Sequence, residues 1–427
     1  MFMQTIMDKV GLKQNGRFYY GWVMVFIGFL LMVFAYVGSI SITSVFVVPV
    51  TESLDIDRST FMLYQTILTV GSVVVTGYFG KRMARGNIKI IMFLSAISAV
   101  IGYVLFANAQ SIAFFYIGAI LIGVGFANCT VLPISIIINN WFGGKIRGTV
   151  MGFSFIGSGI GGLIILPQLN KVISEFGWRS GYYVLAGLFA LVGIILLIFI
   201  VKTPEEKGFT RMGQVEGETS VKNASGMMIK KALKTPMLWL ALLSTTLTVF
   251  GSSAILFNSA PFFIEVGFTP EKAALFASFN LGMLAAGKFV IGFICDRLGT
   301  KFGSIFAALV FGAQFVFLAL LPTNPNLFIW LAILCYGIGG GGITVCPPLL
   351  VNALFGEKDY GNIVATMNMA TNFGGAFGGI IAATIFDFTG SYVTFWWIAA
   401  VAMVIVALFR VACFMLRKNY DYEKDAA

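Results

Sequence analysis

Residues 184–201 read VLAGLFALVGIILLIFIV, a run of 18 residues without a charged or polar side chain. An α-helix made of this run would be apolar on every face. At about 1.5 Å per residue it would nearly span a hydrocarbon core of about 30 Å. A transmembrane β-strand would instead alternate apolar and polar residues over segments of about ten residues. The run therefore predicts a transmembrane α-helix.

The rest of the chain repeats this pattern. Apolar stretches lie at 20–48, 60–80, 88–107, 111–138, 149–170, 180–201, 236–262, 272–294, 303–321, 326–350, 361–385 and 392–416. The chain is 58% hydrophobic and 11% charged, whereas a soluble domain carries about 25% charged residues. This composition excludes a soluble enzyme, a disordered chain and a collagen-like chain. We expect an all-α membrane protein with twelve transmembrane helices surrounded by membrane lipid.

The basic residues predict the orientation of these helices. With both termini on one side, 23 of the 28 Lys and Arg residues fall on that side, four fall on the other, and Lys288 falls within a helix. Loops rich in Lys and Arg remain cytoplasmic. We therefore expect a multi-pass protein of the cell inner membrane with both termini cytoplasmic. The formal net charge of +10 then reflects topology, and we expect no nucleic-acid partner.

Several kinds of chemistry lack the residues that they need. The chain has no histidine, and its five cysteines lack the spacing of a metal site or a disulfide framework. We expect no metal and no cofactor. The apolar stretches also lack paired carboxylates or a nucleophile with its base, which argues against an enzyme. The polar first 19 residues predict no cleavable signal peptide.

The chain divides into two similar halves. A polar segment, 202–235, separates six apolar stretches from six, and we expect it to be a cytoplasmic linker between bundles 1–201 and 236–427. Residues 139–148 read NNWFGGKIRG, and residues 352–361 read NALFGEKDYG, 213 positions later. Residues 77–82, GYFGKR, likewise correspond to residues 292–297, GFICDR. Two similar bundles that rock about a central site are typical of secondary transporters.

These motifs carry a family resemblance. Residues 292–301, GFICDRLGTK, resemble the loop motif of the major facilitator superfamily, in which an acidic residue and cations latch neighbouring helices at the cytoplasmic face. The resemblance assigns this gating role to Gly292, Asp296, Arg297, Gly299 and Lys301, and to Arg82 and Arg85 in the N-terminal copy. That copy departs from the motif, because Lys81 replaces the aspartate and Ala84 the second glycine.

Other short motifs resemble one branch of the superfamily. They are Trp141-Phe142 followed by Arg147-Gly148, Gly177-Trp178-Arg179, Thr235-Pro236 and Gly390-Ser391-Tyr392. Their pattern is similar to that of monocarboxylate transporters and oxalate/formate antiporters. The resemblance implies the major facilitator fold and transport by alternating access.

Lys288 shapes the functional hypothesis more than any other residue. It precedes Asp296 by eight residues and thus lies about 12 Å inside the cytoplasmic end of its helix. A cation at this depth costs about 3 to 10 kcal/mol or more, so we expect it to face an aqueous cavity or an anion. The alternative is a lysine whose stem reaches the inner interface. In the resembling branch this position carries a cation, usually arginine, that holds the substrate carboxylate.

The charge of the cargo follows from the number of buried cations. Oxalate carriers have a second cation in helix eleven, and the matching position here is Met367, next to Asn368. One buried cation balances one carboxylate, whereas a dianion would bring an uncompensated charge. We therefore expect a monomeric carrier of a small organic monocarboxylate held by Lys288. The alternative is an exporter of drugs or other organic solutes in which Lys288 is structural.

Further polar residues are candidates for the substrate cavity: Tyr36, Tyr64, Gln65, Asn128, Asn258, Asn280, Asn368 and Asn372. Each of them can equally form hydrogen bonds between helices. Coupling to protons would use Lys288, or Glu265 near the outer mouth. Exchange of one carboxylate for another would need no proton site.

Overall fold

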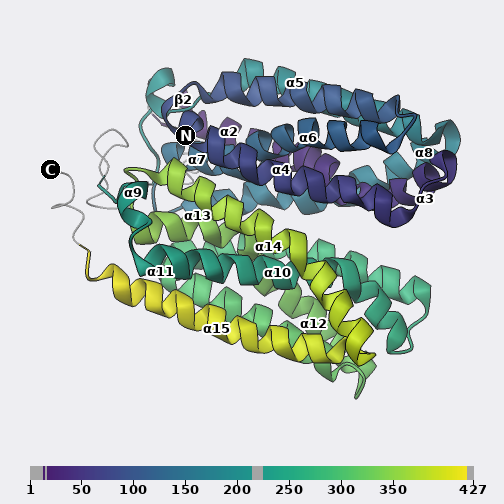
Figure 1. The fold of residues 1–427 in the computed structure, drawn as a ribbon. Coiled ribbons are helices and arrows are strands. Elements are labelled where there is room, and N and C mark those ends of the chain that lie inside the picture. The colour runs from purple at the N-terminus through teal and green to yellow at the C-terminus, as the bar shows by residue number, and fades with distance from the viewer. Residues whose placement is uncertain (1–12, 15–16, 214–224, 421–427) are drawn as a thin grey trace, which may run out of the picture.

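The computed structural model describes residues 13–14, 17–213 and 225–420. Two helical bundles lie side by side, and the chain completes the first before it enters the second (Figure 1). The first bundle contains α2 (Gly21–Leu31), η1 (Met32–Ser41), α3 (Thr43–Leu54), α4 (Arg58–Arg85), α5 (Ile88–Ala107), α6 (Ile112–Cys129), α7 (Val131–Trp141) and α8 (Arg147–Phe199). The second contains α10 (Pro236–Glu265), α11 (Pro270–Leu320), α12 (Pro325–Gly340), α13 (Gly342–Phe355), α14 (Tyr360–Thr389) and α15 (Val393–Arg417).

Within the described residues, ten helical segments are long and apolar enough to cross a membrane. Two of them change direction at a glycine with positive φ, α8 at Gly177 (80°) and α11 at Gly299 (85°), a conformation that glycine adopts without strain. The chain folds back there, because Cys295 and Gly303, on either side of Gly299, are in contact. Each of these segments therefore supplies two spans. The prediction of an all-α protein with twelve transmembrane helices is confirmed.

Three spans change their helical geometry along their length. The first passes from α2 into η1, a π-helix of 10 residues, and then into α3. Long π-helical segments are rare and often occur at functional sites. The fourth span breaks between α6 and α7, and the tenth breaks between α12 and α13. Prolines follow both breaks, Pro133 in α7 and Pro347 with Pro348 in α13, and their missing N–H groups weaken the helical hydrogen bonding there.

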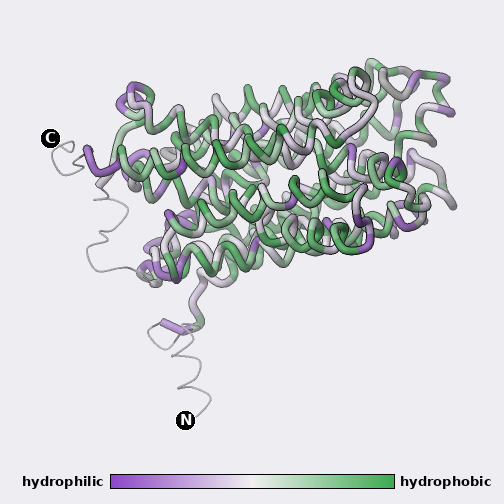
Figure 2. The backbone as a smooth tube through the Cα atoms, turned by 90° about the horizontal axis from the view of Figure 1, so that it is seen from below, coloured by the Kyte–Doolittle hydropathy of each residue, from purple (hydrophilic) through white to green (hydrophobic). Residues whose placement is uncertain are grey.

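Polar residues gather at the two ends of the bundles (Figure 2). One end carries the linker elements η2 (Pro204–Lys207) and α9 (Ile229–Ala232). The short hairpin of β1 (Lys13–Gln14) and β2 (Arg17–Phe18) lies at the same end. We call this the linker end, and the opposite one the far end.

The bundles touch mainly along two helix pairs, α8 with α11 and α4 with α14, and both contacts are tight toward the linker end. In the contact between α8 and α11, which we call the seam, a Cβ added to Gly292 would lie 2.2 Å from the carbonyl oxygen of Gly148. Nearer the far end, a Cβ added to Gly282 would meet nothing within 4 Å. Between α4 and α14, a Cβ at Gly80 would lie 2.4 Å from the Cβ of Ala365. The two halves thus converge at the linker end.

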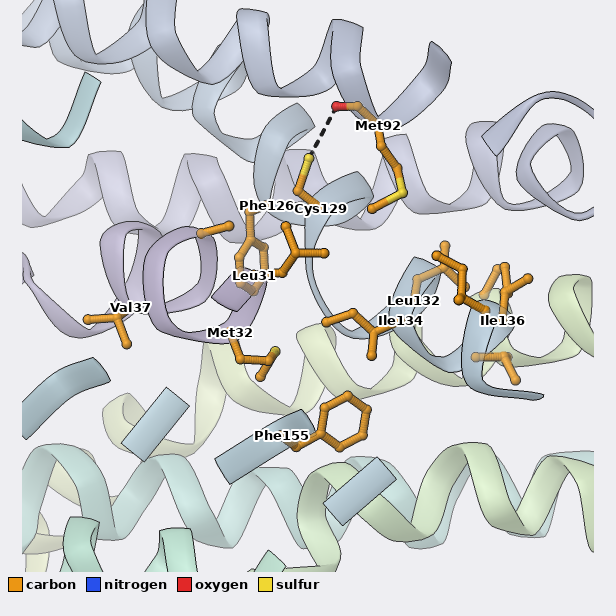
Figure 3. Packing of buried hydrophobic residues seen from close by; sticks show 14 of the residues in the cluster. Leu31, Met32, Val37, Met92, Phe126, Cys129, Leu132, Ile134, Ile136 and Phe155 are labelled. Carbon is orange, nitrogen blue, oxygen red and sulfur yellow. Dashed lines mark hydrogen bonds between the residues drawn. The ribbon is translucent and has the colours of Figure 1, made fainter. Parts of the chain in front are cut away.

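Large apolar side chains fill the first bundle. Leu31 and Met32 of the first span come together with Phe126 of α6 and Phe155 of α8 (Figure 3). Cys129 lies among them, and its thiol donates to the carbonyl oxygen of Met92 at 3.3 Å. The five cysteines are free, and four of them are buried. They behave as small packing residues.

The closest helix contact of the second bundle predicts an effect on stability. A Cβ at Gly287 would lie 1.6 Å from the carbonyl oxygen of Gly337, so a side chain there must push α11 away from α12. We expect Gly287→Ala to reduce the free energy of unfolding by about 1–3 kcal/mol, measured as a lower melting temperature of the purified protein. Gly282→Ala, on the same helix but in open space, is the control. Equal melting temperatures for the two variants would contradict this packing.

Candidate functional site

Lys288 lies in α11 at the seam between the bundles. The residue is 3% exposed. Its Nζ donates to the main-chain oxygen of Phe155 at 3.3 Å and to the Oγ of Ser158, both on α8 of the opposite bundle. Among the described residues, no carboxylate forms an ion pair with Lys288. The buried cation is therefore held by two neutral oxygens, and its side chain points across the seam rather than along it.

A cavity of about 640 Å³ lies between the bundles. Its walls come from η1, α4, α6, α7, α10, α13 and α14, so both halves contribute. Most of the lining side chains are apolar or carry hydroxyl or amide groups. Within the part of the chain that the structure describes, no Asp, Glu, Lys or Arg lines it. Lys288 and its helix lie outside this lining.

Five of the residues predicted from the sequence line the cavity: Tyr36, Gln65, Asn258, Asn368 and Asn372. Some of their polar atoms already have partners in the protein. The Nδ2 of Asn258 donates to the carbonyl oxygens of Ala254 and Gly379 at 3.0 and 3.1 Å. The Nδ2 of Asn372 donates to the Oγ of Ser72 at 3.0 Å, which joins α14 to α4.

Three of the predicted residues do not line the cavity. The hydroxyl of Tyr64 donates to the Oγ1 of Thr43 at 3.0 Å, and the Nδ2 of Asn128 donates to the Oγ of Ser95 at 3.0 Å. Both hydrogen bonds connect helices within the first bundle. Asn280 is 5% exposed, and its Oδ1 lacks a partner among the described residues.

Two polar atoms of the cavity lining are available for hydrogen bonds to a ligand. The Nδ2 of Asn368 and the Oγ1 of Thr344 are buried without a partner among the described residues. Leaving a buried polar atom unpaired costs about 1–3 kcal/mol, so a ligand that pairs with these atoms would recover that cost. Thr344 could not be recognised from the sequence, because a threonine in an apolar stretch usually bonds to its own helix.

Asp296 connects the bundles at the linker end. Its carboxylate accepts hydrogen bonds from the backbone N–H groups of Gly148 at 2.7 Å and Thr149 at 2.6 Å. These groups belong to the first turn of α8, where the helix dipole favours an anion. The lack of a side chain at Gly292 allows the two backbones to approach here.

The remaining predicted gating and coupling residues have other surroundings. The guanidinium of Arg297 lies 5.3 Å from the ring centroid of Phe293, and that of Arg82 lies 3.9 Å from the centroid of Tyr78. Lys301 is exposed, and the side chain of Arg85 falls outside the described part of the structure. Gly299 forms the turn within α11.

Glu265, the predicted coupling residue, is exposed and does not line the cavity. Its carboxylate accepts a hydrogen bond from the Oγ of Ser391 at 2.8 Å.

Glu357, between α13 and α14, forms a second connection between the bundles. Its carboxylate accepts from Arg147 at 2.7 Å and from Arg211 of the linker at 2.6 and 2.7 Å. Asn352 donates to the same carboxylate at 2.9 Å and to the Oδ1 of Asn139 at 3.0 Å. Asn139 and Asn352 are equivalent positions of the two repeats, so the repeated motifs meet each other. The repeat marked these residues in the sequence, but it did not indicate that they pair.

The surroundings of Glu357 change its acidity. Burial raises the pKa of this carboxyl, but the hydrogen bond from Arg211 and the positive charges of Arg147 and Arg211 outweigh burial, so the pKa lies below its usual value of 4.5. A carboxyl whose pKa is lower in the folded state stabilises that state above its unfolded pKa. This contribution is lost as the pH falls through the folded pKa.

Glu357→Gln tests this contribution. At neutral pH we expect the variant to be less stable by about 3 kcal/mol, because two buried guanidinium groups lose their counter-ion. The difference in melting temperature from the unmodified protein should be constant above about pH 6 and shrink as the pH falls below about 4.5. Glu175→Gln, at an exposed ion pair with Lys171, is the control. A difference that does not change with pH would contradict the assignment.

Comparisons with known proteins agree with this architecture. The family model described as Major Facilitator Superfamily matches residues 28–348 and 265–426. The oxalate:formate antiporter of Oxalobacter formigenes is 25% identical over 345 residues, which is 78% of this chain and 78% of the antiporter. Monocarboxylate transporter 12 of Mus musculus is 22% identical over 346 residues, 74% of this chain and 70% of that protein.

Solved structures show the same fold. The fucose:proton symporter FucP of E. coli superposes with a TM-score of 0.70 over 92% of this chain and 99% of its own, at 13% sequence identity. The match of the family model covers most of the chain. The chain therefore belongs to the Major Facilitator Superfamily and is a multi-pass membrane transporter, not an enzyme.

Proposed function

We propose that this protein moves a small organic monocarboxylate across the cell inner membrane by alternating access. The observation that carries the proposal is the Lys288 ammonium, which is buried between the two halves and has only neutral oxygens as partners among the described residues. An ammonium in a region of low dielectric is stabilised far more by a carboxylate than by a hydroxyl or a carbonyl. The antiporter and the monocarboxylate transporter that this chain resembles are named for anionic cargo.

The charged residues in and near the cavity favour a cargo with a single negative charge. Met367, which matches the second cation position of oxalate carriers, is 1% exposed and carries no charge. None of the described residues that line the cavity is ionised at neutral pH. Lys288 thus balances one carboxylate, and a second would stay uncompensated.

The cavity suits the apolar body of the cargo, and the carboxylate reaches Lys288, which lies outside the lining in this conformation, as the seam opens. A volume of about 640 Å³ falls within the range of about 300–1,000 Å³ typical of small-molecule sites. Tyr36 and Phe126 line one wall, and Leu256 and Ile343 line the opposite one. The amide of Asn368 and the hydroxyl of Thr344 provide hydrogen bonds for a polar substituent.

The basic residues support an orientation with the linker end, and with it both termini, in the cytoplasm. In that orientation the two halves are closed on the cytoplasmic side and separated toward the outside, the state that receives cargo from outside the cell. Glu265 lies on the surface away from the cavity. This position favours exchange of carboxylates over proton symport through Glu265.

A second candidate function is export of uncharged organic solutes, with Lys288 as a structural residue. The uncharged lining of the cavity favours it. The two candidates differ in the charge of the ligand, so a pair of ligands of the same shape separates them.

Thermal shifts with lactate and lactamide make this comparison. We expect lactate, and not lactamide, to raise the melting temperature of the purified protein, because a ligand that binds only the folded state stabilises it. Lys288→Ala should weaken lactate binding about a hundredfold through loss of the charge pair, and Lys288→Arg should retain most of it. Lys272→Ala, an exposed lysine of the same helix, is the control.

Stabilisation by lactamide or by organic cations, but not by lactate, acetate, formate or aromatic carboxylates, would contradict the proposal and favour the exporter. If carboxylates still raise the melting temperature of Lys288→Ala, the anion binds at another site.

A further inference from the structure

The partners of Lys288 form a small hydrogen-bonded group on α8. The Ser158 hydroxyl donates its own proton to the carbonyl oxygen of Phe155 at 3.1 Å. Its lone pairs are then free to accept from the Lys288 ammonium, which also donates to that carbonyl at 3.3 Å. Ser158 and Phe155 belong to one half, and Lys288 belongs to the other. The group therefore joins the two halves by a charge-assisted hydrogen bond, the stronger kind.

The backbone around this group is closely packed. A Cβ added to Gly152 would lie 2.4 Å from the carbonyl oxygen of Lys288 itself, and one added to Gly159 would lie 2.4 Å from the Cβ of Ala285. One turn beyond Ala285, Gly282 has nothing within 4 Å. The ammonium thus lies in the closed part of the seam, close to the point at which the seam opens toward the far end.

Opening of the linker end must separate α8 from α11 at this group. The ammonium would then lose both acceptors, and in this conformation it has no ion pair with a carboxylate of the described residues that could remain. A buried cation without a partner is costly. A state that is open at the linker end and has no cargo is therefore disfavoured, whereas a bound anion would remove the penalty.

We infer that Ser158 and the Phe155 carbonyl are the resident partners of Lys288 in the empty transporter, and that the carboxylate of the cargo replaces them. The inference rests on the proposed function and adds a positioning residue to it. Ser158 acts through Lys288, because it holds the empty protein closed at the linker end. The cargo forms a stronger bond to the ammonium than the hydroxyl does, and this exchange of partners releases the seam. Binding is thereby coupled to rocking of the two halves.

The substitution that tests this role is Ser158→Ala, which removes the hydroxyl and keeps the Phe155 carbonyl. Ser158→Thr retains a hydroxyl and serves as the rescue variant. Ser154→Ala is the matched control, because Ser154 lies one turn earlier on α8, is fully buried, and donates to the carbonyl oxygen of Val25 within its own half.

The readout is a distance across the far end, which reports the rocking motion without any transport assay. Spin labels at Gln110→Cys and Thr323→Cys, two exposed loop positions of opposite halves, can be measured by double electron–electron resonance with the five native cysteines replaced by alanine. Without ligand, we expect Ser158→Ala to raise the ratio of the short distance to the long distance about tenfold, as loss of a hydrogen bond to a charged group implies. Ser158→Thr and Ser154→Ala should match the parent protein.

Coincident distance distributions for Ser158→Ala and the parent would overturn the inference, as would an equal shift in Ser154→Ala. Addition of lactate to the parent should reproduce the shift seen in Ser158→Ala without ligand. If Ser158→Ala shifts the distances but no carboxylate does so in the parent, the proposed cargo fails, whereas the role of Ser158 in holding the empty state stands.

Discussion

The ammonium group of Lys288 forms hydrogen bonds across the boundary between the two halves of this transporter. Lys288 leaves α11 and reaches two oxygens of α8, in a part of the seam where glycines bring the backbones together. The group is buried and has no carboxylate partner among the described residues. When α8 moves away from α11, the ammonium therefore loses these two oxygens and needs another partner. That constraint relates the conformation of the protein to the charge of its cargo.

The contacts at the linker end reinforce the same conformation with different chemistry. Asp296 caps the first turn of α8, and Glu357 holds one arginine from the first half and one from the linker. Asp296 and Glu357 are themselves carboxylates, so an anionic cargo is repelled by these side chains and not bound by them. They stabilise the closed linker end whether or not cargo is present. Lys288 differs from them, because a carboxylate can compete for its bonds. In this account the ionic contacts set how stable the closed state is, and Lys288 makes that stability depend on cargo.

The fold could be predicted from the sequence because spans of about 20 apolar residues have few alternatives in a membrane. The two hairpin turns at Gly177 and Gly299 and the repeated halves follow from the same pattern. The π-helical geometry of η1, which packs against α8, could not be predicted, because the apolar pattern of the first span is the same for an α-helix. For the site, the sequence identified Lys288 as buried and five of the eight other candidates as cavity residues. It could not identify Ser158 as the partner of Lys288, because that contact depends on the rotation of two helices from opposite halves. The pairing of Glu357 with Arg211 could not be predicted either, because it depends on how the linker lies against the turn between α13 and α14.

The exchange of Ser158 for cargo on Lys288 can be observed directly. The most direct measurement is an electron cryomicroscopy structure of the unmodified protein with a bound monocarboxylate. We expect a carboxylate oxygen within hydrogen-bonding distance of the Lys288 Nζ, with Ser158 no longer in contact and α8 displaced from α11. A carboxylate bound in the cavity while Lys288 still donates to Ser158 and Phe155 would contradict this exchange.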